Sequence, residues 1–207
     1  MHRLPTEGVR FLRAFMYARS MKLIVGIGNP DPTYAQTRHN VGWLYLDWLN
    51  KKYGNGFEPN KGVEGEIAKA NIEEFPTWLL KPHTYVNASG RAVAKAKLWT
   101  KAKPTDIVVI QDDLDVPFGS CKLSFDKNSG GHRGIESIVN TLKTKKFYRI
   151  KIGLGTRGLK KARQGTTAER DAWIKHFVLK SFTPTEREKL KEVFKECHVR
   201  LMQAFKQ

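Results

Sequence analysis

Cysteine is scarce in this sequence, and its scarcity excludes several kinds of site. The chain of 207 residues contains two cysteines, Cys121 and Cys197, which are too few and too isolated for a disulfide framework or a cysteine metal site. Long apolar runs are also lacking, since none approaches the roughly 20 residues that a helix needs to cross a bilayer. We therefore expect structural thiols in a protein of a reducing compartment, the cytoplasm, with no part inserted in a membrane.

Acidic residues are few in comparison with basic ones. The chain has 20 Asp and Glu residues against 37 Lys and Arg residues, which gives a formal net charge of +17. Such a charge produces a strong positive potential that attracts nucleic acids or anionic membranes. We expect RNA to be the partner; the alternative is a basic protein whose charge serves no partner.

The composition nevertheless predicts a folded protein. Hydrophobic residues make up 40% of the chain and aromatic residues 11%, which argues against intrinsic disorder in spite of the charge. A length of 207 residues allows one sizeable hydrophobic core. A single globular domain is therefore expected.

The first 20 residues differ in composition from the rest. They are rich in arginine, contain Glu7 as their only acid, and precede Met21, where a strand pattern begins. The composition resembles a weak organellar presequence, which would place the protein in an organelle, but an upstream start codon explains it equally well. We predict a poorly ordered or presequence-like extension at 1–20 and the folded domain at 21–207.

Apolar strand patterns alternate with helical patterns along the rest of the chain. A short buried strand is predicted at 22–26, because its apolar run stops at glycine, and an amphipathic helix follows the loop that ends near Thr37 and runs to about Tyr53. Further strands are predicted at 65–72, 77–81, 106–111, about 120–125 and 148–154, and further helices at 88–100 and about 133–143. This alternation predicts a single-domain α/β fold: a mixed, mostly parallel twisted sheet with helices on both faces.

The last third of the chain has two distinct patterns. The stretch 155–170 is cationic, contains glycine and has few large apolar residues, which is typical of a mobile loop. Thr183, Pro184 and Glu186 then supply an N-cap, a proline at the first helical position and the acid of a capping box. A closing amphipathic helix is predicted after them.

A glycine pattern near the first strand does not predict a nucleotide cofactor. Gly26 and Gly28 follow a strand, as in a dinucleotide-binding loop, but Asp31 occupies the place of the third glycine. Pro30 breaks the turn-to-helix geometry that would direct backbone amides at a pyrophosphate. We therefore expect no bound cofactor.

Three polar residues are predicted to meet at one edge of the sheet. Asn29 follows the first strand, His39 precedes the first helix, and Asp112 follows the strong apolar strand at 107–110. Ligands of open α/β sheets bind beyond the carboxyl ends of the strands. A histidine that an aspartate orients and makes more basic can take a proton from water. The alternative is that His39 only starts a helix and that the carboxylates form a solvated turn.

An ordered set of motifs resembles one family of enzymes. Its segments are Lys22–Pro30, Tyr34, Thr37–Gly42, Leu80–Pro82, Thr84–Asn87, Ser89–Gly90, Asp112–Pro117 and Ser129–His132. Together they look like the bacterial-type peptidyl-tRNA hydrolases, which cut the ester bond between a stranded peptide and the 3′ end of a tRNA. The resemblance spans the chain from about Met21 to the C-terminus. It implies a metal-free monomer whose partner is peptidyl-tRNA.

The resemblance also implies roles for individual residues. His39 matches the base that activates water, and Asp112 matches the carboxylate that orients it. Asn29 and Asn87 match asparagines that bind substrate, and Asn87 also helps to place the water. Further residues match or adjoin those that line the site for the terminal nucleotide or the peptide: Tyr34, Tyr85 and His132. A metal site made of His39, His132 and Asp112 is conceivable but is not expected.

The match departs from the family pattern at several positions. Arg133 stands where the family usually has an asparagine, which adds a cation near the substrate channel, and Ser124 stands where a lysine often grips the tRNA end. Three lysines remain as candidate phosphate contacts: Lys122, Lys127 and Lys151. Arg133 and the possible presequence leave room for a noncatalytic RNA-binding scaffold, like the chloroplast splicing factors that resemble this family.

Overall fold

The computed structural model describes residues 20–162 and 164–207. The extension predicted at 1–20 lies outside the described residues except for Ser20, and Arg163 of the stretch 155–170 lies outside them as well. The predictions for these residues therefore stay predictions.

One seven-stranded sheet forms the centre of the fold, with the strand order β2-β3-β4-β1-β5-β7-β6. Its central strands β4, β1, β5 and β7 run parallel to one another, and antiparallel pairs extend it at both sides. The strands are β1 (Lys22–Gly26), β2 (Glu58–Asn60), β3 (Gly65–Ile72), β4 (Phe75–Pro82), β5 (Ile107–Pro117), β6 (Cys121–Phe125) and β7 (Tyr148–Gly155). The predicted mixed α/β sheet is confirmed.

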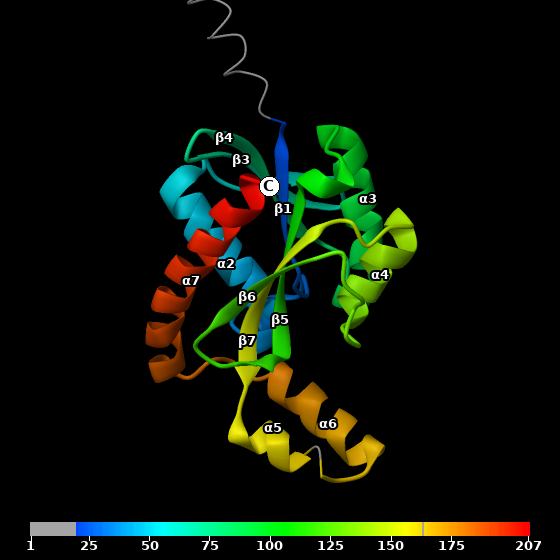
Figure 1. The fold of residues 1–207 in the computed structure, drawn as a ribbon, viewed down its shortest axis with the longest axis vertical. Helices are drawn as coiled ribbons and strands as arrows, with labels where there is room; N and C mark the ends of the chain where they lie inside the picture. Colours follow the sequence, from blue (N-terminus) through cyan, green and yellow to red (C-terminus); the bar gives the residue numbers. More distant parts are fainter. Residues whose placement is uncertain (1–19, 163) are drawn as a thin grey trace, which may run out of the picture.

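Helices cover both faces of this sheet (Figure 1). Helices α2 and α7 pack on one face in a core with Tyr45 and Phe194, whereas α3 and α4 pack on the other in a core with Val93 and Ile138. The helices are α2 (Val41–Tyr53), α3 (Ser89–Thr100), α4 (Arg133–Leu142), α5 (Arg157–Ala162), α6 (Thr167–Val178) and α7 (Pro184–Phe205). No helix of the described residues has the length and apolar character of a membrane span.

Short 3-10 turns connect these elements. They are η1 (Pro32–Tyr34), η2 (Arg38–Asn40), η3 (Val86–Ala88) and η4 (Pro104–Asp106). The turn η2 leads directly into α2, and η3 leads directly into α3. These two turns therefore set the positions of residues at the starts of two helices that lie on opposite faces of the sheet.

Two strand boundaries differ from the prediction. Strand β5 does not end at Gln111 but runs to Pro117, because β7 continues to pair with it at Asp112 and Asp113. The first carboxylates therefore belong to the strand and do not form a turn after it. The hairpin turn between β3 and β4 lies at Glu73 and Glu74, both with positive φ, so that β4 begins at Phe75.

The prediction of a loop at 155–170 is wrong. Helix α5 fills part of this stretch, and α6 begins at Thr167. The two helices form an arm beyond the end of β7 (Figure 1). Apolar periodicity could not indicate α6, because Val178 is the one residue of this helix that is buried. A usable signal was present in Thr166 and Glu169, which form a capping box like that of α7.

Candidate active site

The candidate site lies where the carboxyl end of β1 and the middle of β5 meet the start of α2. Helix α2 approaches these strands closely: a Cβ added to Gly42 would lie 2.7 Å from both the Ile110 carbonyl oxygen and the Ile27 nitrogen. Only glycine permits this approach. The turn η2, which carries His39, is thereby brought against the middle of β5, where Asp112 lies.

Asn40 fixes the chain on both sides of the site. Its Oδ1 accepts a hydrogen bond from the Asn29 backbone N–H at 2.9 Å, and its Nδ2 donates to the Asn29 carbonyl oxygen at 2.9 Å. Asn40 is fully buried. Sequence reasoning did not assign this role, although the residue lies next to His39. Asn40 joins the exit of β1 to the turn that carries the histidine.

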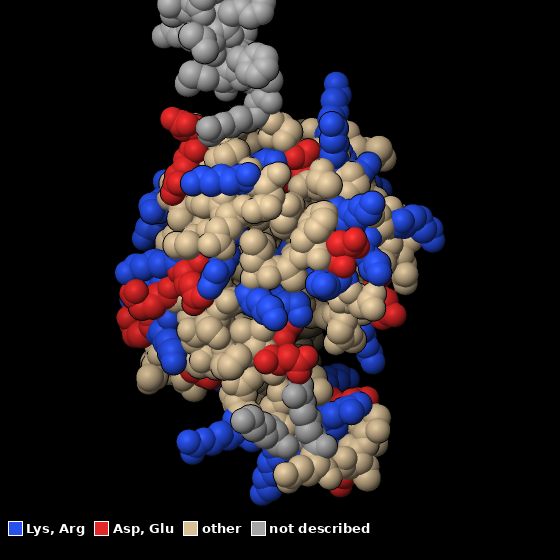
Figure 2. All heavy atoms as spheres, in the orientation of Figure 1, with Lys and Arg blue, Asp and Glu red and all other residues tan. Residues whose placement is uncertain are grey.

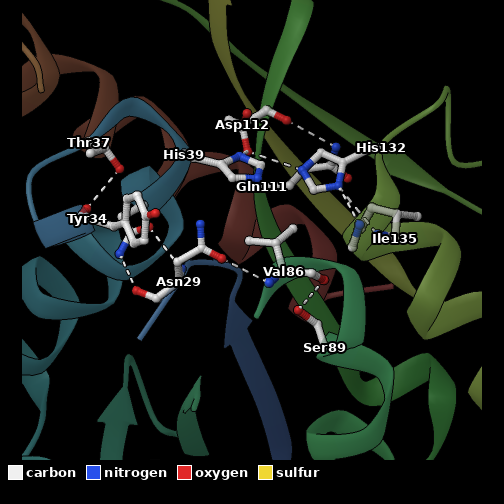
Figure 3. Close-up of polar contacts among 12 residues, drawn as sticks. Asn29, Tyr34, Thr37, His39, Val86, Ser89, Gln111, Asp112, His132 and Ile135 are labelled. Carbon is white, nitrogen blue, oxygen red and sulfur yellow. Dashed lines mark hydrogen bonds and ion pairs between the residues drawn. The ribbon is translucent and has the colours of Figure 1, made fainter. Parts of the chain in front are cut away.

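His39 and Asp112 form a hydrogen-bonded pair, as predicted (Figure 3). His39 Nδ1 lies 2.9 Å from Asp112 Oδ1, and their side chains are 19% and 5% exposed. Burial lowers the pKa of His39, but the charge of Asp112 and its hydrogen bond oppose this effect and raise the pKa above its ordinary value. Burial has the opposite effect on Asp112 and raises its pKa, but the two histidines outweigh burial and hold the pKa of Asp112 far below its ordinary value. Asp112 is thus a carboxylate at neutral pH.

His132 contacts the same carboxylate. Its Nε2 lies 3.1 Å from Asp112 Oδ1, the oxygen that His39 also contacts. Its Nδ1 accepts hydrogen bonds from the backbone N–H groups of Gly134 at 3.1 Å and Ile135 at 3.4 Å, so that His132 is the N-cap of α4. The imidazole therefore carries its proton on Nε2 and donates it to Asp112.

Asn29 faces the same space from the other side. Its side-chain Oδ1 accepts a hydrogen bond from the Val86 backbone N–H at 3.1 Å, which fixes the amide so that Nδ2 points towards the side where His39 lies (Figure 3). The residue is 8% exposed. A fixed and nearly buried amide N–H is a suitable donor for a substrate oxygen.

The other residues predicted to contact substrate lie close to these residues in the chain. Tyr34 lies half-buried on η1, and Asn87 lies exposed on η3, one residue after Val86. Tyr85 precedes η3 and is 59% exposed. Arg133 is the exposed first residue of α4, directly after His132. All four are near the site in the chain, but only Tyr34 and Asn87 lie on the turns that border it.

The predicted phosphate contacts lie on β6, on β7 and after β6. Lys122 and Lys151 are cross-strand neighbours, and Lys127 is exposed in the connection to α4. Lys151 is already engaged, because its Nζ lies 2.7 Å from Asp113 Oδ2. Lys and Arg side chains are spread over this face of the molecule (Figure 2).

A metal ion does not fit the three side chains that lie together. His39, Asp112 and His132 each offer one ligand atom within 4.8 Å of the others. For His132, the atom that faces Asp112 is Nε2, and a metal there would require the proton to move to Nδ1. Nδ1 already accepts two backbone hydrogen bonds. A metal would therefore break the N-cap of α4 as well as the hydrogen bonds to Asp112.

Arg38 is a residue of the site region that the sequence prediction missed. Its side chain is almost fully buried; it donates to the Lys180 and Ser181 carbonyl oxygens and to both carboxylate oxygens of Glu186. The guanidinium also lies over the Phe177 ring, 4.7 Å from its centroid. Arg38 therefore ties the turn that carries His39 to the connection between α6 and α7.

Replacing Arg38 by methionine is expected to lower the free energy of unfolding by about 1–3 kcal/mol, because the two carbonyl groups and the carboxylate lose their charged donor. Urea denaturation of the full chain measures this change. Arg91→Met is the matched control: Arg91 is 65% exposed and pairs with Glu64 at the surface, so that its loss should change stability by less than about 1 kcal/mol. Equal effects of the two variants would contradict the anchoring role of Arg38.

Comparison with known proteins places these features in one family. The sequence model of a family described as "Peptidyl-tRNA hydrolase" matches residues 23–207. The chain is 41% identical over 141 residues to a peptidyl-tRNA hydrolase of Neisseria meningitidis, covering 68% of this chain and 73% of that protein. It is 39% identical over 175 residues to one of Desulfitobacterium hafniense, covering 84% of this chain and 86% of that protein.

Solved structures give the same result. A crystal structure of a peptidyl-tRNA hydrolase from Acinetobacter baumannii superposes with a TM-score of 0.74 at 28% sequence identity, covering 91% of this chain and 94% of that chain. A crystal structure of a peptidyl-tRNA hydrolase in complex with N-propanol superposes with a TM-score of 0.75, also at 28% identity. The similarity therefore extends over nearly the whole chain and not over a single motif.

Proposed function

Because the chain belongs to the peptidyl-tRNA hydrolase family, we propose that it hydrolyses the ester bond between the peptide and the tRNA of peptidyl-tRNA. The observation that carries this proposal is the partly buried His39–Asp112 pair, with Nδ1 and Oδ1 2.9 Å apart, just beyond the carboxyl end of β1. A fixed imidazole beside a carboxylate is the arrangement that general-base catalysis requires.

In this proposal His39 is the base. With its Nδ1–H donated to Asp112, His39 keeps the lone pair of Nε2 for a water molecule. Nε2 takes one proton from the water while the oxygen attacks the ester carbonyl carbon. The C–O bond to the ribose then breaks, and the proton passes from the imidazolium to the departing ribose oxygen. The leaving group of the ester is the ribose oxygen, which departs more readily than the amine of an amide. A water molecule and one base are therefore sufficient, and no Ser or Cys nucleophile is needed.

The two asparagines act as the polar clamp. Asn29 Nδ2 is directed by the bond between Asn29 Oδ1 and the Val86 N–H, and it donates to a substrate oxygen. Asn87, exposed on the neighbouring turn η3, binds substrate and helps to place the water. Amides suit both tasks because they donate and accept hydrogen bonds at neutral pH without competing for the proton.

The basic surface holds the tRNA. Lys122 and Lys127 contact phosphates, and Lys151 does so when a phosphate draws it away from Asp113. Arg133 adds a cation beside the substrate channel. Tyr34, Tyr85 and His132 line the site that binds the terminal nucleotide or the peptide. Phosphate contacts give affinity that is insensitive to sequence and sensitive to salt, as an enzyme that accepts most tRNAs requires. In this proposal the protein acts as a monomer in the cytoplasm and returns tRNA to translation.

The experiment that tests the proposal is release of labelled N-acetyl-amino acid from N-acetyl-aminoacyl-tRNA by the full chain, at constant salt, with and without a chelator. We expect multiple-turnover hydrolysis at the same rate in both conditions, since the base needs no metal. A protein that binds the tRNA without cleaving it would instead be the noncatalytic RNA-binding scaffold. A rate that the chelator abolishes would contradict the metal-free mechanism.

A further inference from the structure

One carboxylate oxygen receives both histidines of the site. Asp112 Oδ1 lies 2.9 Å from His39 Nδ1 and 3.1 Å from His132 Nε2, and the histidine rings are 5.7 Å apart. We infer that His132 is a positioning residue for the reaction: it holds Asp112 and limits how strongly this carboxylate stabilises a proton on His39. The inference rests on the proposed function, in which His39 is the base.

Helix α4 fixes the donor that His132 presents. The Gly134 and Ile135 N–H groups at the start of α4 both point at His132 Nδ1. A proton on Nδ1 would replace two hydrogen bonds by two repulsive N–H contacts at the positive end of a helix. The proton of the ring therefore stays on Nε2, and Asp112 always meets a donor at this position.

Because Asp112 Oδ1 accepts hydrogen bonds from both histidines, its interaction with the base, His39, is weaker. A carboxylate that already accepts a hydrogen bond from His132 is more stable as an anion and attracts a proton less strongly. His39 is therefore less easily protonated than it would be beside Asp112 alone. The enzyme keeps more of its base in the neutral form, which is the form that can accept a proton from water.

The charged residues that adjoin Asp112, His39 and His132 in the chain have other partners or face solvent. Within the described ranges, Asp113 of β5 pairs with Lys151 of β7, and Arg38 of η2 pairs with Glu186 of α7. Arg133 at the start of α4 is exposed to solvent. The hydrogen bonds of Asp112 to His39 and His132 thus form a unit that a change at His132 can test by itself.

Two substitutions of His132 separate its contacts. Asparagine is a good N-cap and can replace Nδ1 towards α4, but it is too short to reach Asp112. Glutamine is a poor N-cap, but its Nε2 can replace the donor to Asp112. His132→Asn therefore removes the contact to the carboxylate and keeps the cap, whereas His132→Gln does the reverse.

The experiment compares the pH dependence of kcat/KM for both variants and the parent between about pH 5 and 8, the range in which histidine titrates. In His132→Asn the acid limb should move to higher pH by about half to one pH unit, because Asp112 then holds the His39 proton more firmly. In His132→Gln the limb should stay near that of the parent while the melting temperature falls. Histidine NMR titration of His39 should show the same shift in His132→Asn.

The possible results separate the inference from the proposed function. If the parent does not hydrolyse the ester, the proposed function fails. If the parent hydrolyses it and the acid limb of His132→Asn coincides with that of the parent or moves to lower pH, the positioning role is overturned. A melting temperature for each variant, together with the NMR titration, keeps the test valid where a variant is poorly active.

Discussion

Replacing His39 by alanine is expected to lower kcat for N-acetyl-aminoacyl-tRNA by about 10²–10⁴-fold, the range that general-base catalysis contributes. The substitution removes the only side chain of the proposed mechanism that accepts a proton, so that water must attack without a base. His39 is 19% exposed and is not one of the proposed phosphate contacts. tRNA affinity should therefore stay close to that of the parent.

The measurement is single-turnover hydrolysis together with binding of uncleaved tRNA at the same salt concentration. His176→Ala is the matched control, because His176 lies exposed on α6 and bonds to no residue of the site. This control should hydrolyse the ester at the parent rate. A His39→Ala variant that loses binding and turnover in equal measure would show that His39 serves the fold or the tRNA surface and not the proton transfer.

Asp112→Asn should give the second large loss, also about 10²–10⁴-fold in kcat. An asparagine is nearly the same size, and its Oδ1 can still accept hydrogen bonds from both histidines, but it carries no negative charge. The imidazolium that forms when His39 takes a proton from water then loses the charge that stabilises it. The residual activity should come from molecules in which the neutral amide still orients the imidazole.

The pH dependence of Asp112→Asn should also change in a defined direction. In the parent, Asp112 raises the pKa of His39 against the effect of burial. Without the carboxylate only burial remains, so that the pKa falls and the acid limb of kcat/KM moves to lower pH. This shift is opposite to the one expected for His132→Asn. The two variants therefore test the effect of the Asp112 carboxylate on the pKa of His39 by shifts in opposite directions.

Asp171→Asn provides the control for the loss of a carboxylate. Asp171 lies exposed on α6 beside Arg170, and its removal should change kcat by less than about twofold, as expected for a weak surface pair. If Asp112→Asn kept most of the parent activity and an unchanged pH profile, Asp112 would be a buried structural carboxylate. His39 would then need another source of orientation.

Most of the elements were predictable from the sequence because their signals are local. Strand β1 and helix α2 were predicted within a residue or two of their observed bounds, since a short apolar run and a helical repeat do not depend on the rest of the fold. The capping box of α7 was predicted for the same reason. Helix α6 was missed because it buries little and leaves no apolar stripe.

The site was predictable in part. The residue types and the edge of the sheet predicted that His39 and Asp112 would meet, and the structure brings them within 2.9 Å. The sequence could not predict that Asp112 lies inside β5, since this depends on pairing with β7 across a long sequence separation. It gave no sign of the anchoring by Arg38, whose partner Glu186 lies 148 residues away.

The sequence by itself determined most of the strands, most of the helices, the positive charge and the set of reactive groups, because composition and short-range periodicity encode them. The short strand β2 was missed, because its three residues carry no apolar pattern. The tertiary structure alone decided which nitrogen of His132 carries the proton and which oxygen of Asp112 the two histidines share. A tautomer depends on the partners of both ring nitrogens, and these partners come from β5 and α4, which only packing brings together.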